Sequence, residues 1–398
     1  MMLLNTKPSR YLLLLLICFS FGAASAVANP SRHFKPYLIS QYSEDMSKYF
    51  ASPILENAVR GKLGISEVEP ITREQLSKIT SLKLSSTNLS YLEGIEYLNN
   101  LKDLDLAFNQ ISDLTPLTEL SNLTILRLSY NQISDLNPLN KLSNLTELKI
   151  GSNQIKDLTP LAELRNLEKI FLSNNQISDV SLLAGLINLT RLELSKNEIS
   201  DVSPLAGFKN LNQLNLSENE ISDVSPLAGL KKLEYILLSS NQINNITSLV
   251  KLKYLEGLDL SNNKINDFTI LTKFTHLTYL NLSNTQISDI SFLAELTSLL
   301  NLYLSENQIR DISPLAQLTS LVTLYVYDNQ ISDVSPLARL NDLKYLNLSE
   351  NQISNIAPLS KLKDLSRLNL KNNSIINFEP IENLAEECVG CEISAQKL

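Results

Sequence analysis

The chain has 398 residues, of which 43% are hydrophobic and 19% are charged, and it contains no tryptophan. Its formal net charge is −8, which argues against nucleic acid as a partner, because binding a phosphate backbone requires a basic face. A chain of this length could form two or three domains, but one sequence period runs through most of it.

The first residues have the pattern of an export signal. Lys7 and Arg10 precede a short apolar run, residues 11–21, and small residues follow as far as Ala28. We therefore expect residues 1–28 to be a signal peptide cleaved after Ala28. The alternatives are an uncleaved membrane anchor, for which the run is short, and a lipoprotein modified at Cys18, for which the preceding residue is not small.

The next segments predict a helical N-terminal cap. Residues 29–45 carry no clear pattern and are expected to be a lead-in, whereas residues 46–78 contain helix signals. In SPILENAVRGKLG, residues 52–64, the apolar residues Leu55, Ala58, Val59 and Leu63 fall on one helical face. Thr72 and Gln75 have the spacing of a capping box at the start of a second helix.

Residues 79–386 consist of fourteen repeats of 22 residues. Repeat seven, LNQLNLSENEISDVSPLAGLKK at 211–232, shows the pattern: positions 1, 4, 6, 11, 14, 17 and 20 are apolar in nearly every repeat. Position 9 is Asn except at Thr87 and Thr285. This is the leucine-rich repeat signature, L-x-x-L-x-L-x-x-N-x-I.

The period also predicts the structure of each repeat. The L-x-L segment alternates between inward and outward residues and predicts a short strand, and the Asn side chains are expected to form a ladder at the turn that follows. Ser203-Pro204 and Ser225-Pro226 suggest a serine cap before a turn of 3₁₀ helix. The expected fold is an α/β leucine-rich repeat solenoid, a curved right-handed coil. A parallel β-sheet lines its concave face and short 3₁₀ or helical turns its convex face.

After the last repeat, residues 387–398 are expected to form a C-terminal cap or tail. Cys388 and Cys391 lie there as CVGC, without the surrounding pattern of a redox motif or enough further ligands for zinc. In an exported protein the two cysteines are candidates for a local disulfide.

The cap and the ISDVSPLAGL-type repeats together resemble the internalin family of bacterial surface and secreted proteins. The segment EPITREQLSKITSLKLSSTNLSYLEGIEYLNNL at 69–101 carries the same resemblance, which covers about residues 50–386. It implies an exported adhesion or host-interaction module that binds a protein on its concave face. Typical members continue into an immunoglobulin-like domain and often a wall-sorting signal. This sequence ends twelve residues after the last repeat, so release from the cell or residence in a periplasm fits better than wall attachment.

Residue patterns for catalysis or cofactor binding are weak. His33 and His276 have no spaced partner for acid–base work or metal binding, so an enzyme is not expected and no cofactor or metal is predicted. Position 13 is an aspartate in ten repeats. These carboxylates could attract Ca²⁺, but acceptance of local backbone N–H groups in Asx-turns is the favoured interpretation.

Outward-facing positions point to a candidate binding surface. Repeats two to six carry mixed charges around Phe171, whereas repeats ten to thirteen carry five tyrosines: Tyr279, Tyr303, Tyr325, Tyr327 and Tyr345. Glu306, Asp328 and Glu350 would rim that tyrosine patch with negative charge, which suits a basic partner surface. Exposed tyrosines combine apolar area with a hydroxyl, and binding hot spots favour them. The other interpretation is that strands simply favour aromatic residues.

These features together predict a non-enzymatic, exported scaffold, a monomer, that binds a protein partner through its concave face. Two alternatives stay open. The first is a receptor for glycans or an envelope polymer, since stacked Tyr and Asn also suit sugars, and the second is a periplasmic structural or assembly factor.

Overall fold

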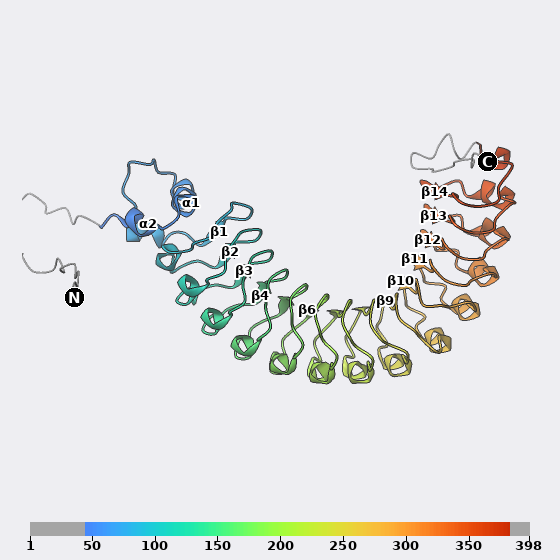
Figure 1. Cartoon of the computed structure of the whole chain (residues 1–398), viewed down its shortest axis with the longest axis horizontal. Helices are drawn as coiled ribbons and strands as arrows, with labels where there is room; N and C mark the ends of the chain where they lie inside the picture. The colour runs from blue at the N-terminus through green and yellow to red at the C-terminus, as the bar shows by residue number, and fades with distance from the viewer. Residues whose placement is uncertain (1–43, 383–398) are drawn as a thin grey trace, which may run out of the picture. The chain divides into compact units, whose positions relative to one another are not determined.

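The computed structural model describes residues 44–382. The predicted signal peptide, nearly all of the lead-in, the end of repeat fourteen and the Cys388/Cys391 pair lie outside the described residues. Within the described part, the repeats stack side by side in one curved array, with the strands on the concave side and the short helical turns on the convex side (Figure 1).

The N-terminal cap consists of the 3₁₀ helix η1 (Met46–Tyr49) and the α-helices α1 (Pro53–Leu63) and α2 (Arg73–Leu76). Leu55 and Val59 of α1 are fully buried, and Ala58 and Leu63 pack against the same core, as the apolar spacing predicts. The predicted capping box is confirmed. The Thr72 hydroxyl accepts the Gln75 backbone N–H, and the Gln75 side chain accepts the Thr72 backbone N–H.

One parallel sheet contains the fourteen strands of the described region, in chain order, and each strand pairs with the next in a register of 22 residues. The strands are β1 (Ser81–Lys83), β2 (Asp103–Asp105), β3 (Ile125–Arg127), β4 (Glu147–Lys149), β5 (Lys169–Phe171), β6 (Arg191–Glu193), β7 (Gln213–Asn215), β8 (Tyr235–Leu237), β9 (Gly257–Asp259), β10 (Tyr279–Asn281), β11 (Asn301–Tyr303), β12 (Thr323–Tyr325), β13 (Tyr345–Asn347) and β14 (Arg367–Asn369).

A short 3₁₀ helix forms the convex side of each repeat, so the predicted turn or so of helix is confirmed. These helices are η2 (Ile95–Tyr97), η3 (Thr115–Leu117), η4 (Asn137–Leu139), η5 (Thr159–Leu161), η6 (Ser181–Leu183), η7 (Ser203–Gly207), η8 (Ser225–Gly229), η9 (Thr247–Lys251), η10 (Thr269–Lys273), η11 (Ser291–Glu295), η12 (Ser313–Gln317), η13 (Ser335–Arg339), η14 (Ala357–Lys361) and η15 (Glu379–Ile381).

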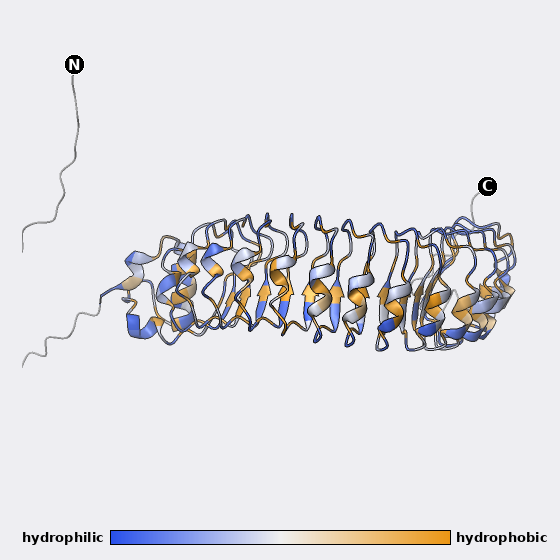
Figure 2. Cartoon of the chain, turned by 90° about the horizontal axis from the view of Figure 1, so that it is seen from below, coloured by the Kyte–Doolittle hydropathy of each residue, from blue (hydrophilic) through white to orange (hydrophobic). Residues whose placement is uncertain are grey.

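The core lies between the sheet and the 3₁₀ helices and is continuous through the array. In repeat seven, the seven apolar positions are at most 2% exposed: Leu211, Leu214, Leu216, Ile221, Val224, Leu227 and Leu230. Apolar segments recur at the same place in successive repeats when the array is seen from the convex side (Figure 2). Full burial of one such side chain stabilises the fold by about 1.5–3 kcal/mol, but only a stack of repeats buries them.

The position-9 asparagines form the predicted ladder. The Asn219 amide oxygen accepts the backbone N–H of Ile199 at 3.0 Å, and its amide nitrogen donates to the carbonyls of Leu194 and Leu216, each at 3.0 Å. Leu194 and Ile199 belong to the preceding repeat, so each Asn satisfies backbone groups of two repeats at once. Thr285 is one of the two residues that replace Asn at position 9, and its hydroxyl donates to the Leu282 carbonyl.

A second asparagine ladder, which we did not predict from the sequence, lies at the other end of the strands. At position 22 of repeats one to six, the Asn amide donates to the backbone carbonyl 23 residues earlier. The residues are Asn100, Asn122, Asn144, Asn166, Asn188 and Asn210. Repeat-to-repeat spacing is therefore fixed by side-chain amides at both ends of the strands in this part of the array.

The expectation that serine caps the 3₁₀ helices is wrong. Ser203 and Ser225 are the first helical residues, and the cap positions are Val202 and Val224, which have no capping side-chain bond. Aspartate at position 13 makes the bond instead: the Asp201 carboxylate accepts the Ser203 backbone N–H at 2.8 Å. The physical reason is that a buried apolar residue must fill position 14, so the capping acceptor moves one residue earlier.

Ten aspartates make this same bond to the backbone N–H two residues later, which is the Asx-turn geometry that we favoured over calcium. These hydrogen bonds lower the pKa of several of the carboxyls; for Asp113, the leading causes are bonds from the side chain and the backbone of Thr115.

No helix within residues 44–382 is both long enough and apolar enough to span a bilayer.

Candidate functional site

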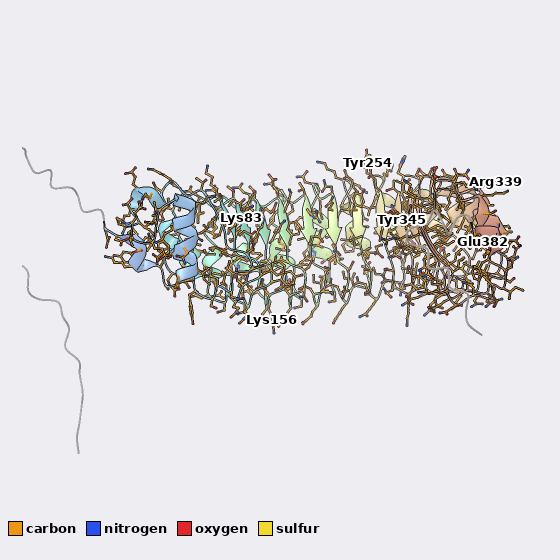
Figure 3. All side chains as sticks on the ribbon, turned by 90° about the horizontal axis from the view of Figure 1, so that it is seen from above. Lys83, Lys156, Tyr254, Arg339, Tyr345 and Glu382 are labelled. Atoms are coloured by element: carbon orange, nitrogen blue, oxygen red, sulfur yellow. The ribbon has the colours of Figure 1, made fainter. Side chains whose placement is uncertain are left out.

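The two halves of the concave face carry different side chains. In β1–β6, nine of the twelve outward strand residues are charged: Lys83, Asp103, Asp105, Arg127, Glu147, Lys149, Lys169, Arg191 and Glu193. In β7–β14 only two of the sixteen are charged, Asp259 and Arg367. Five of the remaining residues are tyrosines and five are asparagines. Figure 3 looks onto this face, with Lys83 and Tyr345 on its strands and Tyr254 at the edge of the array.

Three of the predicted tyrosines form a continuous row across neighbouring strands. The ring centroids of Tyr279 and Tyr303 are 5.5 Å apart, and those of Tyr303 and Tyr325 are 5.3 Å apart in an edge-to-face arrangement. Tyr303 and Tyr325 are direct partners in the register of β11 and β12, which places equivalent side chains together. Each ring is half-buried, and we refer to these three residues as the tyrosine row.

Tyr327 lies beside the tyrosine row, at the point where the chain leaves β12. Its hydroxyl donates to a carboxylate oxygen of Glu306 at 2.9 Å, which ties it back to the preceding repeat. Glu306, Asp328 and Glu350, the residues of the predicted acidic rim, occupy position 8 of successive repeats and are exposed. Beneath this region the Ser305 hydroxyl is buried and has no hydrogen-bond partner in the described structure.

Tyr345 lies on β13, diagonal to Tyr325 in the strand register. It pairs in register with Thr323 on β12, and it is 36% exposed. Within the described residues its ring makes no aromatic contact.

Tyr235 on β8 lies over Gly257 of the neighbouring strand β9, where a Cβ atom would approach the ring to 2.3 Å. Because Gly257 has no Cβ atom, the Tyr235 ring can lie close to the backbone of β9. We did not predict this contact from the sequence.

Burial shifts the pKa of three tyrosines on this face upwards: Tyr279, Tyr303 and Tyr327. The pKa of Tyr279 rises to about 12, chiefly because burial disfavours the phenolate and secondarily because of the Asp259 carboxylate nearby. Burial also raises the pKa of Tyr303 and Tyr327, with the Glu306 carboxylate adding to the effect at Tyr327. Tyr279 and Tyr303 thus keep their protons across the physiological range and present uncharged hydroxyl groups.

Phe171 has a different environment from the tyrosines. The Lys149 ammonium lies 4.8 Å from its ring centroid, and the Arg191 guanidinium lies 5.1 Å from it. Both cations also pair with carboxylates on their own strands, Lys149 with Glu147 and Arg191 with Glu193. Phe171 is therefore covered by charges of its own chain, and in this structure it is the centre of an ionic cluster.

Sequence reasoning did not single out a second aromatic pair at position 8, Phe108 and Tyr130. Their rings stack with centroids 4.3 Å apart and planes 10° from parallel, and each residue is 54% exposed. The signal was present in the sequence, because position 8 is otherwise polar or charged throughout the repeats.

A shallow groove of about 1360 Å³ follows the opposite edge of the array, where the strands begin. It is lined by positions 22 and 2 of successive repeats, including Asn144, Thr146 and Asn166, and His276 lies near its end. Most of its amides and hydroxyls already bond to backbone carbonyls, as the Thr146 hydroxyl does to Thr124. Within the described residues, no group of three or more His, Cys, Asp or Glu side chains could hold a metal ion.

Known proteins with similar sequences and structures share this architecture. The family model that describes two copies of the leucine-rich repeat matches residues 121–163, 165–207, 253–295, 297–339 and 342–385. Among solved structures, internalin InlF from Listeria monocytogenes is 35% identical with a TM-score of 0.77, over 85% of this chain and 99% of that one. Internalin C2 from the same organism is 40% identical with a TM-score of 0.53, over 55% and 96% of the two chains.

A more distant similarity is to a plant peptide hormone receptor, RGFR1, solved in complex with RGF2. It is 26% identical with a TM-score of 0.65, over 81% of this chain and 56% of the receptor chain. Among curated proteins, none matches the chain.

Proposed function

This chain belongs to the internalin family of leucine-rich repeat proteins, and on that basis we propose that it is a non-enzymatic scaffold that binds a protein partner through its concave face. The observation that carries the proposal is the tyrosine row, in which three half-buried rings touch across three neighbouring strands. The similarity to a receptor solved with its peptide hormone supports protein recognition as the general role.

The tyrosine row has the physical properties of a protein-binding surface. Its rings are held by one another and by the strand register, so they lose little side-chain entropy when a partner covers them. Each ring combines apolar area with a hydroxyl that can reach a polar group of the partner. We place the anchor of the interface at Tyr303 and Tyr325, with Tyr279, Tyr327 and Tyr345 around them.

Charge gives the interface a preferred partner surface. Glu306, Asp328 and Glu350 are exposed along one border of the tyrosine row, so a basic rim on the partner would complement them. Phe171 stays in the proposal as part of the charged half, where it would support a contact made mainly by Lys149 and Arg191.

We also propose that the chain acts outside the cytoplasm, as an exported monomer, either secreted or periplasmic. The support is the pattern of residues 1–28 and the membership in a family of surface and secreted proteins. Fractionation of cells that produce the native protein, followed by N-terminal sequencing, tests this. Cleavage after Ala28 is expected, and an intact N-terminus in the cytoplasmic fraction would contradict it.

The binding proposal is tested by capture of surface proteins on the immobilised chain, with a glycan array in parallel. A saturable protein ligand is expected. The array distinguishes the glycan alternative, because the asparagines beside the tyrosine row, such as Asn281 and Asn347, could also bind sugar hydroxyls. Selective glycan binding without any protein ligand would replace the proposal with that alternative.

A further inference from the structure

The exposed aromatic stack near the N-terminal end of the array lies at backbone positions that do not favour aromatic residues. Position 8 has a positive φ in all fourteen repeats, with 57° at Phe108 and 60° at Tyr130. The other twelve residues there are polar or charged. A bulky side chain in the left-handed region is unfavourable compared with Asn, so the fold itself does not require these two rings.

The outer faces of the stack are open to a ligand. Phe108 and Tyr130 cover only their inner faces, since the rings are 4.3 Å apart and each residue is 54% exposed. The flanking residues at position 8 are Ser86 and Ser152, whose side chains are too short to cover an aromatic ring. A flat group could therefore extend the stack on either side.

Elsewhere in this chain, the open faces of some aromatic rings are covered by cationic side chains. Phe171 lies between Lys149 and Arg191, and the Arg73 guanidinium lies 5.3 Å from the Tyr97 ring centroid. Over residues 44–382, no cation of the chain itself covers Phe108 or Tyr130 in this way.

Asp105, the acidic residue nearest to Phe108 along the chain, lies between Lys83 and Arg127 in the strand register. Asp105, three residues before Phe108, accepts the backbone N–H of Ala107 at 3.1 Å and forms no ion pair in the described part of the chain. Arg127 faces Asp105 in the strand register but pairs with Asp103 at 2.5 Å instead. Lys83 forms no ion pair with Asp105 either, so within the described residues this carboxylate is without an ion-pair partner, in a chain whose formal net charge is −8.

We infer that Phe108, Tyr130 and Asp105 form a second contact surface, which receives an arginine side chain of a protein partner. A guanidinium group is flat, stacks on aromatic faces and pairs with a carboxylate, so it satisfies all three residues at once. This surface lies in repeats two and three, whereas the tyrosine row lies in repeats ten to twelve. The inference therefore goes beyond the proposed function and does not depend on the tyrosine row.

The test uses the full chain and two synthetic peptides, acetyl-Gly-Arg-Gly-Arg-Gly-amide and the same peptide with citrulline, the neutral analogue, at both positions. Nuclear magnetic resonance titration at low ionic strength gives both affinities. We expect the arginine peptide to bind about tenfold more tightly and to shift the ring signals of Phe108 and Tyr130.

Three variants separate this surface from the general acidity of the chain. In Phe108→Asn/Tyr130→Asn, both rings are replaced by a residue that position 8 uses with similar φ at Asn174 and Asn262, so the fold is retained. The preference for arginine should disappear in this variant and in Asp105→Asn, and it should persist in Tyr303→Asn/Tyr325→Asn. Equal affinity for the two peptides, or an arginine preference that survives in Phe108→Asn/Tyr130→Asn, would overturn the inference.

Discussion

The two halves of the concave face share one scaffold and differ in almost every outward residue. Strands β1–β6 present an ionic surface in which Arg127 pairs with Asp103 and Phe171 lies between two cations. Strands β7–β14 present tyrosine and asparagine, with only Asp259 and Arg367 charged. The buried apolar positions and the position-9 asparagine ladder run through both halves, whereas the position-22 ladder belongs to the charged half.

The difference shows how the repeat separates folding from recognition. Positions 1, 4 and 6 of each repeat are buried whatever their neighbours on the concave face are, so the outward positions 3 and 5 can vary without loss of the core. A surface feature that departs from its own repeat therefore points to a role outside folding. The tyrosine row and the Phe108–Tyr130 stack are two such departures.

The largest expected effect tests whether the scaffold really is equivalent in the two halves. Asn197→Ala and Asn329→Ala each remove a buried amide that bonds to four backbone groups. Each should lower the free energy of unfolding by about 2–4 kcal/mol, because backbone groups lose their partners. Chemical denaturation measures both values.

The matched control is Asn329→Thr, which introduces the residue that the chain has at Thr285. It should cost less than Asn329→Ala, since the Thr285 hydroxyl still bonds to a backbone carbonyl. A much larger loss at Asn197 than at Asn329 would show that the two halves differ in their scaffold as well as in their surface.

Alkaline pH should affect the tyrosine half selectively. The pKa of Tyr279 in the folded protein is about 12, above its ordinary value of about 10. In the unfolded chain this phenol loses its proton first, so its stabilising contribution is complete below pH 10 and is lost as the pH rises towards 12. Tyr279→Phe should reduce this loss, as measured by thermal unfolding between pH 9 and about 12. Identical pH profiles for the variant and the parent chain would contradict the assignment.

High salt should affect the charged half, and only weakly. The side chains of Arg127 and Asp103 are 26% and 34% exposed, so their pair is worth about 1 kcal/mol or less. Arg127→Met should therefore destabilise the chain by less than about 1 kcal/mol in low salt and by less still in about 1 M sodium chloride. A salt-independent loss would mean that packing of the arginine stem, not its charge, stabilises this region.

The smallest expected effect concerns the acidic residues common to both halves. The position-13 aspartates already accept backbone N–H groups, so a calcium chelator should leave the melting temperature unchanged. A clear fall in melting temperature on chelation, reversed by added calcium, would show that these carboxylates bind metal.

The fold follows from the sequence because the repeat specifies each turn of the chain fourteen times. The strands, the 3₁₀ turns and the position-9 asparagine ladder were predictable, since each depends on interactions between fixed repeat positions. The Thr72–Gln75 capping box was predictable from its own local spacing. The capping role assigned to Ser203 was wrong because burial of Val202 takes precedence, and Asp201 makes the bond.

The sequence predicts which strand positions the candidate site residues occupy, but not which side chains they contact. The register of neighbouring strands brings Tyr303 and Tyr325 together, and the sequence period alone indicates this. Side-chain rotamers decide the rest. They turn Tyr327 towards Glu306, place Tyr235 over Gly257 and stack Phe108 on Tyr130, and no repeat position specifies those choices.

The central claim, that the tyrosine row is the anchor of a protein interface, is tested most directly by one affinity comparison. Tyr303→Asn/Tyr325→Asn replaces both rings by the residue that position 5 has at Asn281 and Asn347, so the scaffold is preserved. Tyr254→Ala is the matched control, because Tyr254 is 68% exposed and lies at the edge of the array. Against a captured protein partner, the double variant should bind at least about 30-fold more weakly than the parent chain, and the control should bind as the parent does. Equal affinity of the double variant and the parent chain would contradict the claim.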